Sequence, residues 1–324
     1  MNAGMFSLLI SRTSMSKVIL LALGIFSSIC AEAQPVKSAK SQPARSISVK
    51  TEANATIWID GVRYGKTGDD GNLKVSSISP GKHSVRVRAD GFKEVVKPLL
   101  AAQRGELEIP LTKTTDEAQL AFQQGELLAA SDREKAAEAY IKAIRLRPAY
   151  PESFSGLARV YSESGQREKA EKAIRDLRKI RPGYPEASAI EGRILKEGGD
   201  DLKAIAAFKR AITEGKGFQP EAYTGLGLLY KEKAETFAGA GDYEQESANY
   251  AEAAKYLRVA AKQLGSSPDA IVVYQLLGLV YEQQKKPKEA IAVYEEFLRV
   301  FPDIPESVAV QSFIVQLKKQ MNEP

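Results

Sequence analysis

The stretch that decides the fold is Pro151–Pro185, which reads PESFSGLARVYSESGQREKAEKAIRDLRKIRPGYP. Large apolar residues lie three and four positions apart in its first half, and Gly165 then interrupts the pattern. A second stripe of the same kind runs from Ala170 to Leu177 before Pro182 ends it. This spacing places the apolar side chains on one face of each of two helices. Such a pair cannot bury its apolar faces alone, so the stretch predicts an array of similar pairs.

Copies of this unit recur along the rest of the chain. The dipeptide Pro-Glu that begins the quoted stretch returns at Pro185-Glu186 and Pro220-Glu221. Proline fits the first position of a helix, and the following Glu is favoured by the positive end of the helix dipole. We expect five helix pairs and a final helix that covers the last apolar face. Their predicted ranges are 116–150, 151–184, 185–219, 220–267, 268–302 and, for the last helix, 303–324.

This pattern resembles the tetratricopeptide repeat, in which small residues let two helices approach and large residues fill the space between them. The resemblance implies an all-α superhelical solenoid whose groove binds a protein partner. One regular copy that carries it consists of Tyr274, Leu277, Gly278, Tyr281, Ala290, Tyr294, Phe297 and Pro302.

The fourth predicted pair is longer than the others. Tyr161 and Gly165 are four positions apart, whereas their counterparts Tyr230 and Gly241 are eleven apart. Seven residues are also added between Gly241 and Ala253. Because seven residues are close to two helical turns, the apolar stripe stays in phase, and the hairpin should protrude by about 10 Å. A protrusion of this kind either contacts a partner or is a neutral variation in length.

Between residues 46 and 113 the apolar pattern has a period of two instead. Short alternating runs such as Thr56–Ile59 are separated by turn signals, among them Asp60-Gly61 and Pro80-Gly81. Several short strands at this spacing predict a small antiparallel β-sandwich.

This region resembles the PEGA domain family over nearly its whole length. Glu52 stands where the family has proline and Asn54 where it has glycine, and Asn tolerates the left-handed backbone of such a turn. The resemblance implies an Ig-like β module of extracytoplasmic proteins, with nothing catalytic. The matching segments are Glu52-Ala53-Asn54-Ala55, Thr56-Ile57-Trp58-Ile59-Asp60-Gly61, Gly65-Lys66-Thr67, Pro80-Gly81-Lys82-His83-Ser84-Val85 and Asp90-Gly91-Phe92.

Residues 1–33 have the features of a secretory signal peptide. Arg12 and Lys17 precede an apolar run, Val18–Ile29, that is too short to span a bilayer comfortably. The small residues of Ala31-Glu32-Ala33 predict cleavage after Ala33, followed by a linker over 34–45 and a periplasmic or secreted protein. The alternative is an uncleaved membrane anchor.

Cys30 is the only cysteine of the chain. It could be the acylated residue of a lipoprotein, but the bulky Ile29 disfavours cleavage just before it. With cleavage after Ala33, the mature chain has no cysteine, which excludes disulfides and Cys-ligated zinc.

The net charge of +5 conceals an asymmetry. Residues 35–113 carry 14 Lys and Arg against 8 Asp and Glu, whereas residues 114–324 carry 30 against 32. The basic excess therefore belongs to the predicted β domain. Nucleic acid is not expected as a partner, because no Arg-rich helix accompanies the charge.

No catalytic constellation is evident, so we expect no enzyme, no cofactor and no metal. His83 is the single histidine, and a zinc site or a nucleophilic triad cannot be assembled around it. Acidic residues are interleaved with Lys and Arg, as in Glu168-Lys169, which is typical of solvated helix surfaces. The lone Trp58 is expected in the core of the β domain, although exposure on the opposite sheet face is the alternative.

The candidate binding residues lie on the predicted first helices of the repeats. The ninth and twelfth positions of the unit that starts at Pro151 should face the concave groove. Their cations favour an acidic segment or a free C-terminal carboxylate, unless they only form a solvated face with the neighbouring acids. The predicted protein-binding residues are Arg159, Arg193, Lys196 and Lys231.

We therefore interpret the chain as a non-enzymatic adaptor of the cell envelope. The solenoid would hold a protein segment, and the β domain would contact envelope or surface material. One alternative is a structural envelope component whose basic β domain binds anionic wall or outer-membrane polymer. Another is an accessory subunit of an envelope enzyme or secretion complex.

Overall fold

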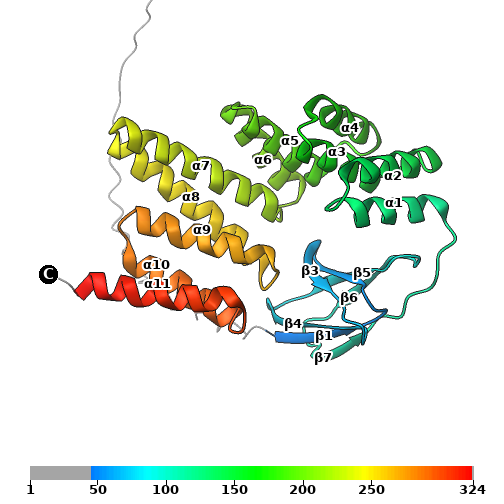
Figure 1. Ribbon diagram of the computed structural model, residues 1–324, viewed down its shortest axis with the longest axis horizontal. Helices are drawn as coiled ribbons and strands as arrows, with labels where there is room; N and C mark the ends of the chain where they lie inside the picture. The colour runs from blue at the N-terminus through cyan, green and yellow to red at the C-terminus, as the bar shows by residue number, and fades with distance from the viewer. Residues whose placement is uncertain (1–44, 323–324) are drawn as a thin grey trace, which may run out of the picture. The chain divides into compact units, whose positions relative to one another are not determined.

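The structure is a computed structural model that describes residues 45–322, and these residues belong to one compact unit. Within the described residues, seven strands are followed by eleven helices (Figure 1). The predicted fold class, an all-β domain before an all-α solenoid, is confirmed. The predicted signal peptide, Cys30 and the linker up to residue 44 lie outside the described residues.

The β domain consists of two sheets. The first has the order β4-β1-β7, in which β1 pairs antiparallel with β4 but parallel with β7. The second has the order β3-β2-β5-β6 and is antiparallel throughout. The parallel pair departs from the purely antiparallel sandwich that the turn signals predicted. The strands are β1 Arg45–Lys50, β2 Thr56–Ile59, β3 Val62–Lys66, β4 Asn72–Ile78, β5 His83–Arg88, β6 Val95–Leu99 and β7 Gly105–Glu108.

The core of the β domain lies between these two sheets. Strand β2 directs Ile57 and Ile59 into it, with 0% and 3% of their surface exposed. Because successive side chains of a strand point to opposite faces, Trp58 lies on the outer face of its sheet and is only half-buried. The prediction that Trp58 is a core residue is therefore wrong.

The helices follow one another in pairs (Figure 1). Proline occupies the first turn of α3, α5, α7 and α10, where its missing N–H costs no hydrogen bond. Helices α7 and α8 contain 21 and 22 residues, whereas the helices of the other pairs contain 12 to 15. The bounds are α1 Glu117–Leu128, α2 Arg133–Leu146, α3 Pro151–Glu163, α4 Arg167–Ile180, α5 Pro185–Glu197, α6 Asp201–Glu214, α7 Pro220–Ala240, α8 Tyr243–Leu264, α9 Asp269–Gln283, α10 Pro287–Val300 and α11 Pro305–Asn322.

Glycines let an aromatic ring of one helix enter between its two neighbours. The ring of Phe208 on α6 lies against Gly192 of α5 and Gly225 of α7. A Cβ atom at position 192 would lie 2.6 Å from Phe208 Cδ1. This distance is shorter than van der Waals contact allows, so the two atoms would clash. Tyr140 of α2 lies in the same way against glycines of α1 and α3. These contacts join the first pair of helices to the second and the third pair to the fourth.

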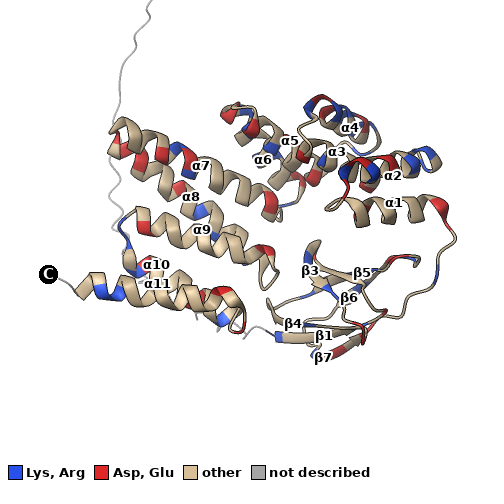
Figure 2. Cartoon of the chain, in the orientation of Figure 1, with Lys and Arg blue, Asp and Glu red and all other residues tan. Residues whose placement is uncertain are grey.

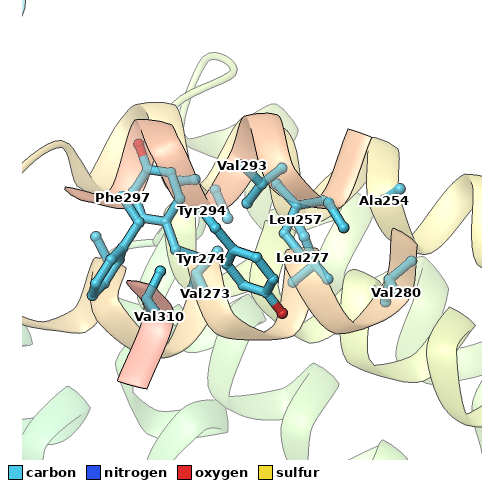
Figure 3. Close-up of a cluster of buried hydrophobic side chains, with 14 of the residues drawn as sticks. Ala254, Leu257, Val273, Tyr274, Leu277, Val280, Val293, Tyr294, Phe297 and Val310 are labelled. Carbon is cyan, nitrogen blue, oxygen red and sulfur yellow. The ribbon is translucent and has the colours of Figure 1, made fainter. Parts of the chain in front are cut away.

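Apolar side chains of α8, α9, α10 and α11 pack together at the C-terminal end of the solenoid (Figure 3). Tyr274 of α9 meets Phe297 of α10 edge-on, with ring centroids 6.0 Å apart. Helix α11 covers this cluster with Val310, which is 1% exposed. The last helix therefore buries an apolar surface that a further repeat would otherwise cover.

Replacement of Gly192 by Ala should destabilise the solenoid by about 1–3 kcal/mol, because the added Cβ forces Phe208 out of its position. Gly239 in α7 is the matched control, since a Cβ there meets nothing within 4 Å. Gly239→Ala should be neutral or stabilising by up to about 1 kcal/mol. Chemical denaturation followed by circular dichroism measures both changes, and equal stability of Gly192→Ala and the parent would contradict the packing described.

Candidate functional site

The β domain contacts the first helix of the solenoid through a buried arginine. Arg88 of β5 is 9% exposed, and its Nη1 donates to Glu126 Oε2 of α1 at 3.0 Å. Its Nε donates to Glu94 Oε2 at 2.8 Å. The guanidinium lies over the ring of Phe122 on α1 at 4.5 Å and 5.0 Å from the ring centroid of Trp58. Two carboxylates and two aromatic rings thus surround one buried cation.

A side-chain amide completes the contact with α1. Gln123 is 4% exposed, and its Nε2 donates to the backbone oxygen of Phe92 at 2.7 Å. Its Oε1 accepts from the backbone N–H of Gly91 at 2.9 Å. Both polar ends of this buried side chain therefore bind the loop between β5 and β6.

A second contact joins strand β3 to the C-terminal half of the solenoid. Val62 belongs to the same buried apolar cluster as Leu257 and Leu264 of α8, and Tyr64 packs against that cluster. Ser266, after α8, donates its hydroxyl to the backbone oxygen of Ser77 at 2.9 Å. Burial, aided by the charge of Asp60, raises the pKa of Tyr64 to about 12. The β domain is thus held at two separate places on the solenoid.

A cavity of about 980 Å³ lies between the β domain and the solenoid. Trp58 and the segment from Asp60 to Arg63 line one side, and residues of α3 and α5 to α9 line the other. Its wall includes two exposed apolar side chains, Val272 at 57% and Phe218 at 37%. The hollow is partly open to solvent, and its volume lies at the upper end of the range found for ligand pockets.

Three of the four predicted binding residues line this cavity. Arg159, Arg193 and Lys196 belong to its wall, whereas Lys231 does not. Each cation has a carboxylate close by, so the predicted basic track is a row of ion pairs. Lys196 Nζ lies 2.6 Å from Glu232 Oε1 and Lys231 Nζ 2.5 Å from Glu235 Oε1.

Arg159 forms a bidentate ion pair with Glu221. Its Nη1 and Nη2 donate to the two carboxylate oxygens at 3.1 and 2.7 Å. The side chains keep 37% and 32% of their surface exposed, as expected on the floor of a groove. Burial alone would raise the pKa of Glu221, yet the charge and hydrogen bonds of Arg159 hold that pKa below its ordinary value. This ion pair connects α3 with α7 at the bottom of the groove.

Arg193 stands apart from the other three cations. Its Nη1 is 3.8 Å from Glu163 Oε1 and 3.7 Å from Glu221 Oε1, beyond hydrogen-bond distance. Its Nε and Nη2 are buried and have no hydrogen-bond partner in the described chain.

The charged lining of the cavity is nearly balanced, with four cations and five carboxylates, or −1. Figure 2 shows acidic and basic residues interspersed along the helices. Sequence reasoning noted acids beside the predicted cations, but it missed their pairing between helices and the contribution of the β domain. The lining residues with charge are Arg63, Arg159, Arg193, Lys196, Asp60, Glu186, Glu197, Glu221 and Asp269.

Residues 45–322 contain no group of three or more side chains that could hold a metal ion. Both ring nitrogens of His83 face acceptors, Asp60 Oδ2 at 2.6 Å and the backbone oxygen of Ser79 at 2.9 Å. His83 therefore stabilises the turn between β2 and β3 through its contact with Asp60. Within the same range, no helix is long and apolar enough to cross a membrane.

Family comparisons agree with both resemblances. The PEGA domain matches residues 45–114, and two tetratricopeptide repeat models match residues 127–194 and 271–304. No curated protein matches the chain.

Several solved structures are similar to this chain. Yeast Tom70 is 19% identical with a TM-score of 0.50, and the match covers 64% of this chain and 41% of that one. A tetratricopeptide repeat protein of Thermus thermophilus is 19% identical with a TM-score of 0.45, over 61% of this chain and 99% of that one. The MamA protein is 21% identical with a TM-score of 0.39, over 58% and 93%. At these identities the likeness concerns the fold. The chain therefore carries a PEGA domain followed by a helical solenoid that contains tetratricopeptide repeats.

Proposed function

We propose that this protein is a non-enzymatic scaffold of the cell envelope whose groove binds a segment of a protein partner. Tetratricopeptide repeats generally serve as non-catalytic binding surfaces, and such surfaces use the concave side of the solenoid. The observation that carries the proposal is the cavity of about 980 Å³ beside α3, α5 and α7. Its exposed Val272 and Phe218 offer apolar surface that a partner would remove from water.

The envelope location is part of the proposal and rests on the sequence. The basic residues and short apolar run before Ala33 are those of a secretory leader. The PEGA domain would then contact surface material while the groove holds the partner. An accessory subunit of an envelope enzyme or secretion complex would use the same groove and differ only in its partner.

Val272→Glu should reduce the amount of protein partner captured by the full chain from source-cell extract by at least about tenfold, because it places a charge on the apolar wall. Leu202→Glu is the matched control, since Leu202 is 79% exposed on α6 and does not line the cavity. Quantitative mass spectrometry of the captured proteins gives the ratio. A partner retained equally by both variants would show that the groove is not the binding surface.

A second candidate function is attachment to an anionic wall or outer-membrane polymer. It is favoured by exposed lysines on both sheets of the PEGA domain, namely Lys50 on β1, Lys66 on β3 and Lys74 on β4.

If the polymer contact operates, binding of the protein to the insoluble envelope fraction should fall steeply as NaCl rises from about 50 to about 500 mM, because salt screens exposed charges. The triple change of Lys50, Lys66 and Lys74 to Gln should weaken the binding at low salt. Co-sedimentation measures both effects, with Val272→Glu as the groove control. Binding that is insensitive to salt and to the lysine changes would rule this function out.

A further inference from the structure

We propose that the PEGA domain is a hinged cover of the groove. Val62 would latch the domain to the end of α8, and the domain would pivot about its contact with α1 when the latch opens. This inference rests on the proposed function, because it concerns access of the partner segment to the same groove. It adds a regulatory role for the PEGA domain, since the closed protein is then autoinhibited.

The PEGA domain covers a row of side chains that a groove ligand would contact. Glu126 of α1 and Arg193 of α5 each follow a glycine that faces an aromatic ring of the next helix, so they occupy equivalent places in their repeats. Arg88 of the PEGA domain is paired with Glu126. Arg193 lines the cavity whose other side is formed by Trp58 and the segment Asp60–Arg63. The PEGA domain therefore binds one end of this row and faces Arg193 across the cavity.

Each domain has its own apolar core, so the two can separate without unfolding. The buried cluster of the PEGA domain contains residues 47–111 only. Among the described residues, Val62 is the only buried apolar side chain of the PEGA domain that belongs to a cluster of the solenoid. An interface between two domains of one chain permits relative motion unless it is large and apolar. This interface is neither.

The contacts at the end of α8 are suited to a latch. Val62 is 6% exposed within the apolar cluster of the solenoid. The hydroxyl of Tyr64 lies against the backbone of Gly265, since a Cβ atom there would be 2.8 Å from it. The hydroxyl of Ser266 donates to the backbone oxygen of Ser77 at 2.9 Å. These few contacts lie far along the chain from the connection between the two domains, so they can open while the connection stays intact.

The contact with α1 is suited to a pivot, because it is continuous with the connection between the domains. The N–H of Gly91 donates to the side chain of Gln123 on α1. The backbone oxygen of Gly91 accepts from the N–H of Thr114 in the connecting segment at 2.9 Å. Asp116, two residues later, caps the start of α1. The loop after β5, the connection and α1 are thus bonded to one another, and this end should remain attached when the latch opens.

Distance measurement between two spin labels tests the opening without a partner. The labels are attached to cysteines at the exposed positions 106 in β7 and 288 in α10 of the full chain, with Cys30 replaced by Ser. Val62→Glu places a charge in the apolar cluster and should open the latch, which adds a second, longer distance. Val62→Ala should add less of it, and Val96→Glu, at a 60% exposed position of β6, none. A single distance in Val62→Glu, equal to that of the parent, would overturn the latch.

Capture from source-cell extract tests whether the cover controls the groove. Val62→Glu should capture at least about threefold more partner than the parent, because a larger fraction of the protein is open. Cysteines at positions 77 and 266, which are in contact across the latch, allow a short thiol-to-thiol cross-linker to lock it. The locked protein should lose capture, whereas the same protein treated with a single-headed thiol reagent should retain it. Equal capture by locked, parent and Val62→Glu protein would overturn the cover.

Val272→Glu, added to Val62→Glu, separates this inference from the proposed function. Loss of the additional capture in the double variant would show that the opened groove is the binding surface. Capture that is lost in Val272→Glu but is the same in Val62→Glu and the parent would overturn the cover and leave groove binding intact. Capture that Val272→Glu does not change would overturn groove binding, even if the two distances show that the domain opens.

Discussion

The buried guanidinium of Arg88 is the contact on which the arrangement of this molecule depends. A buried cation without counter-charges is strongly destabilising, so Arg88 needs both Glu94 of its own domain and Glu126 of α1. Glu126 also accepts a hydrogen bond from Tyr140 of α2 at 2.6 Å. Burial, with the adjacent charge of Glu126, raises the pKa of that phenol, so Tyr140 remains a donor. One electrostatic cluster therefore links the PEGA domain to the interior of the first helix pair.

The docked PEGA domain covers part of the concave surface of the solenoid. Stacked helix pairs alone form a concave surface that is open along its length. Here the PEGA domain is held at α1 and again at the end of α8, so the surface between these contacts becomes the wall of a cavity. Its wall combines exposed apolar side chains with charged residues of both signs. Each of the four predicted groove cations lies near a carboxylate, so they do not form a free basic surface.

The periodicity of the sequence was sufficient to predict the repeats, because each unit carries its own apolar stripes and glycines. It also placed Arg159, Arg193 and Lys196 on the side that lines the cavity. It could not identify their partners, since Glu221 is 62 residues from Arg159 and reads locally as the first turn of a helix. Trp58 was misplaced because an alternating pattern does not say which face of a strand is inside.

The docking of the PEGA domain had no signal in the sequence at all. It depends on single side chains such as Gln123 and Val62, which look like ordinary helix and strand residues until the tertiary structure brings their partners near. Local patterns report on the elements, whereas contacts between domains depend on how the elements are placed.

Amide hydrogen exchange at Gly91 tests the docking most directly. Its N–H donates to the side chain of Gln123 on α1, whereas the N–H of Asp60 donates to Ser84 within the PEGA domain. The account predicts slow exchange at both amides in the full chain, and loss of protection at Gly91 but not at Asp60 in Gln123→Ala. Exchange of the Gly91 amide at the rate of an unstructured chain in the parent protein would contradict it, because the two domains would then not be docked.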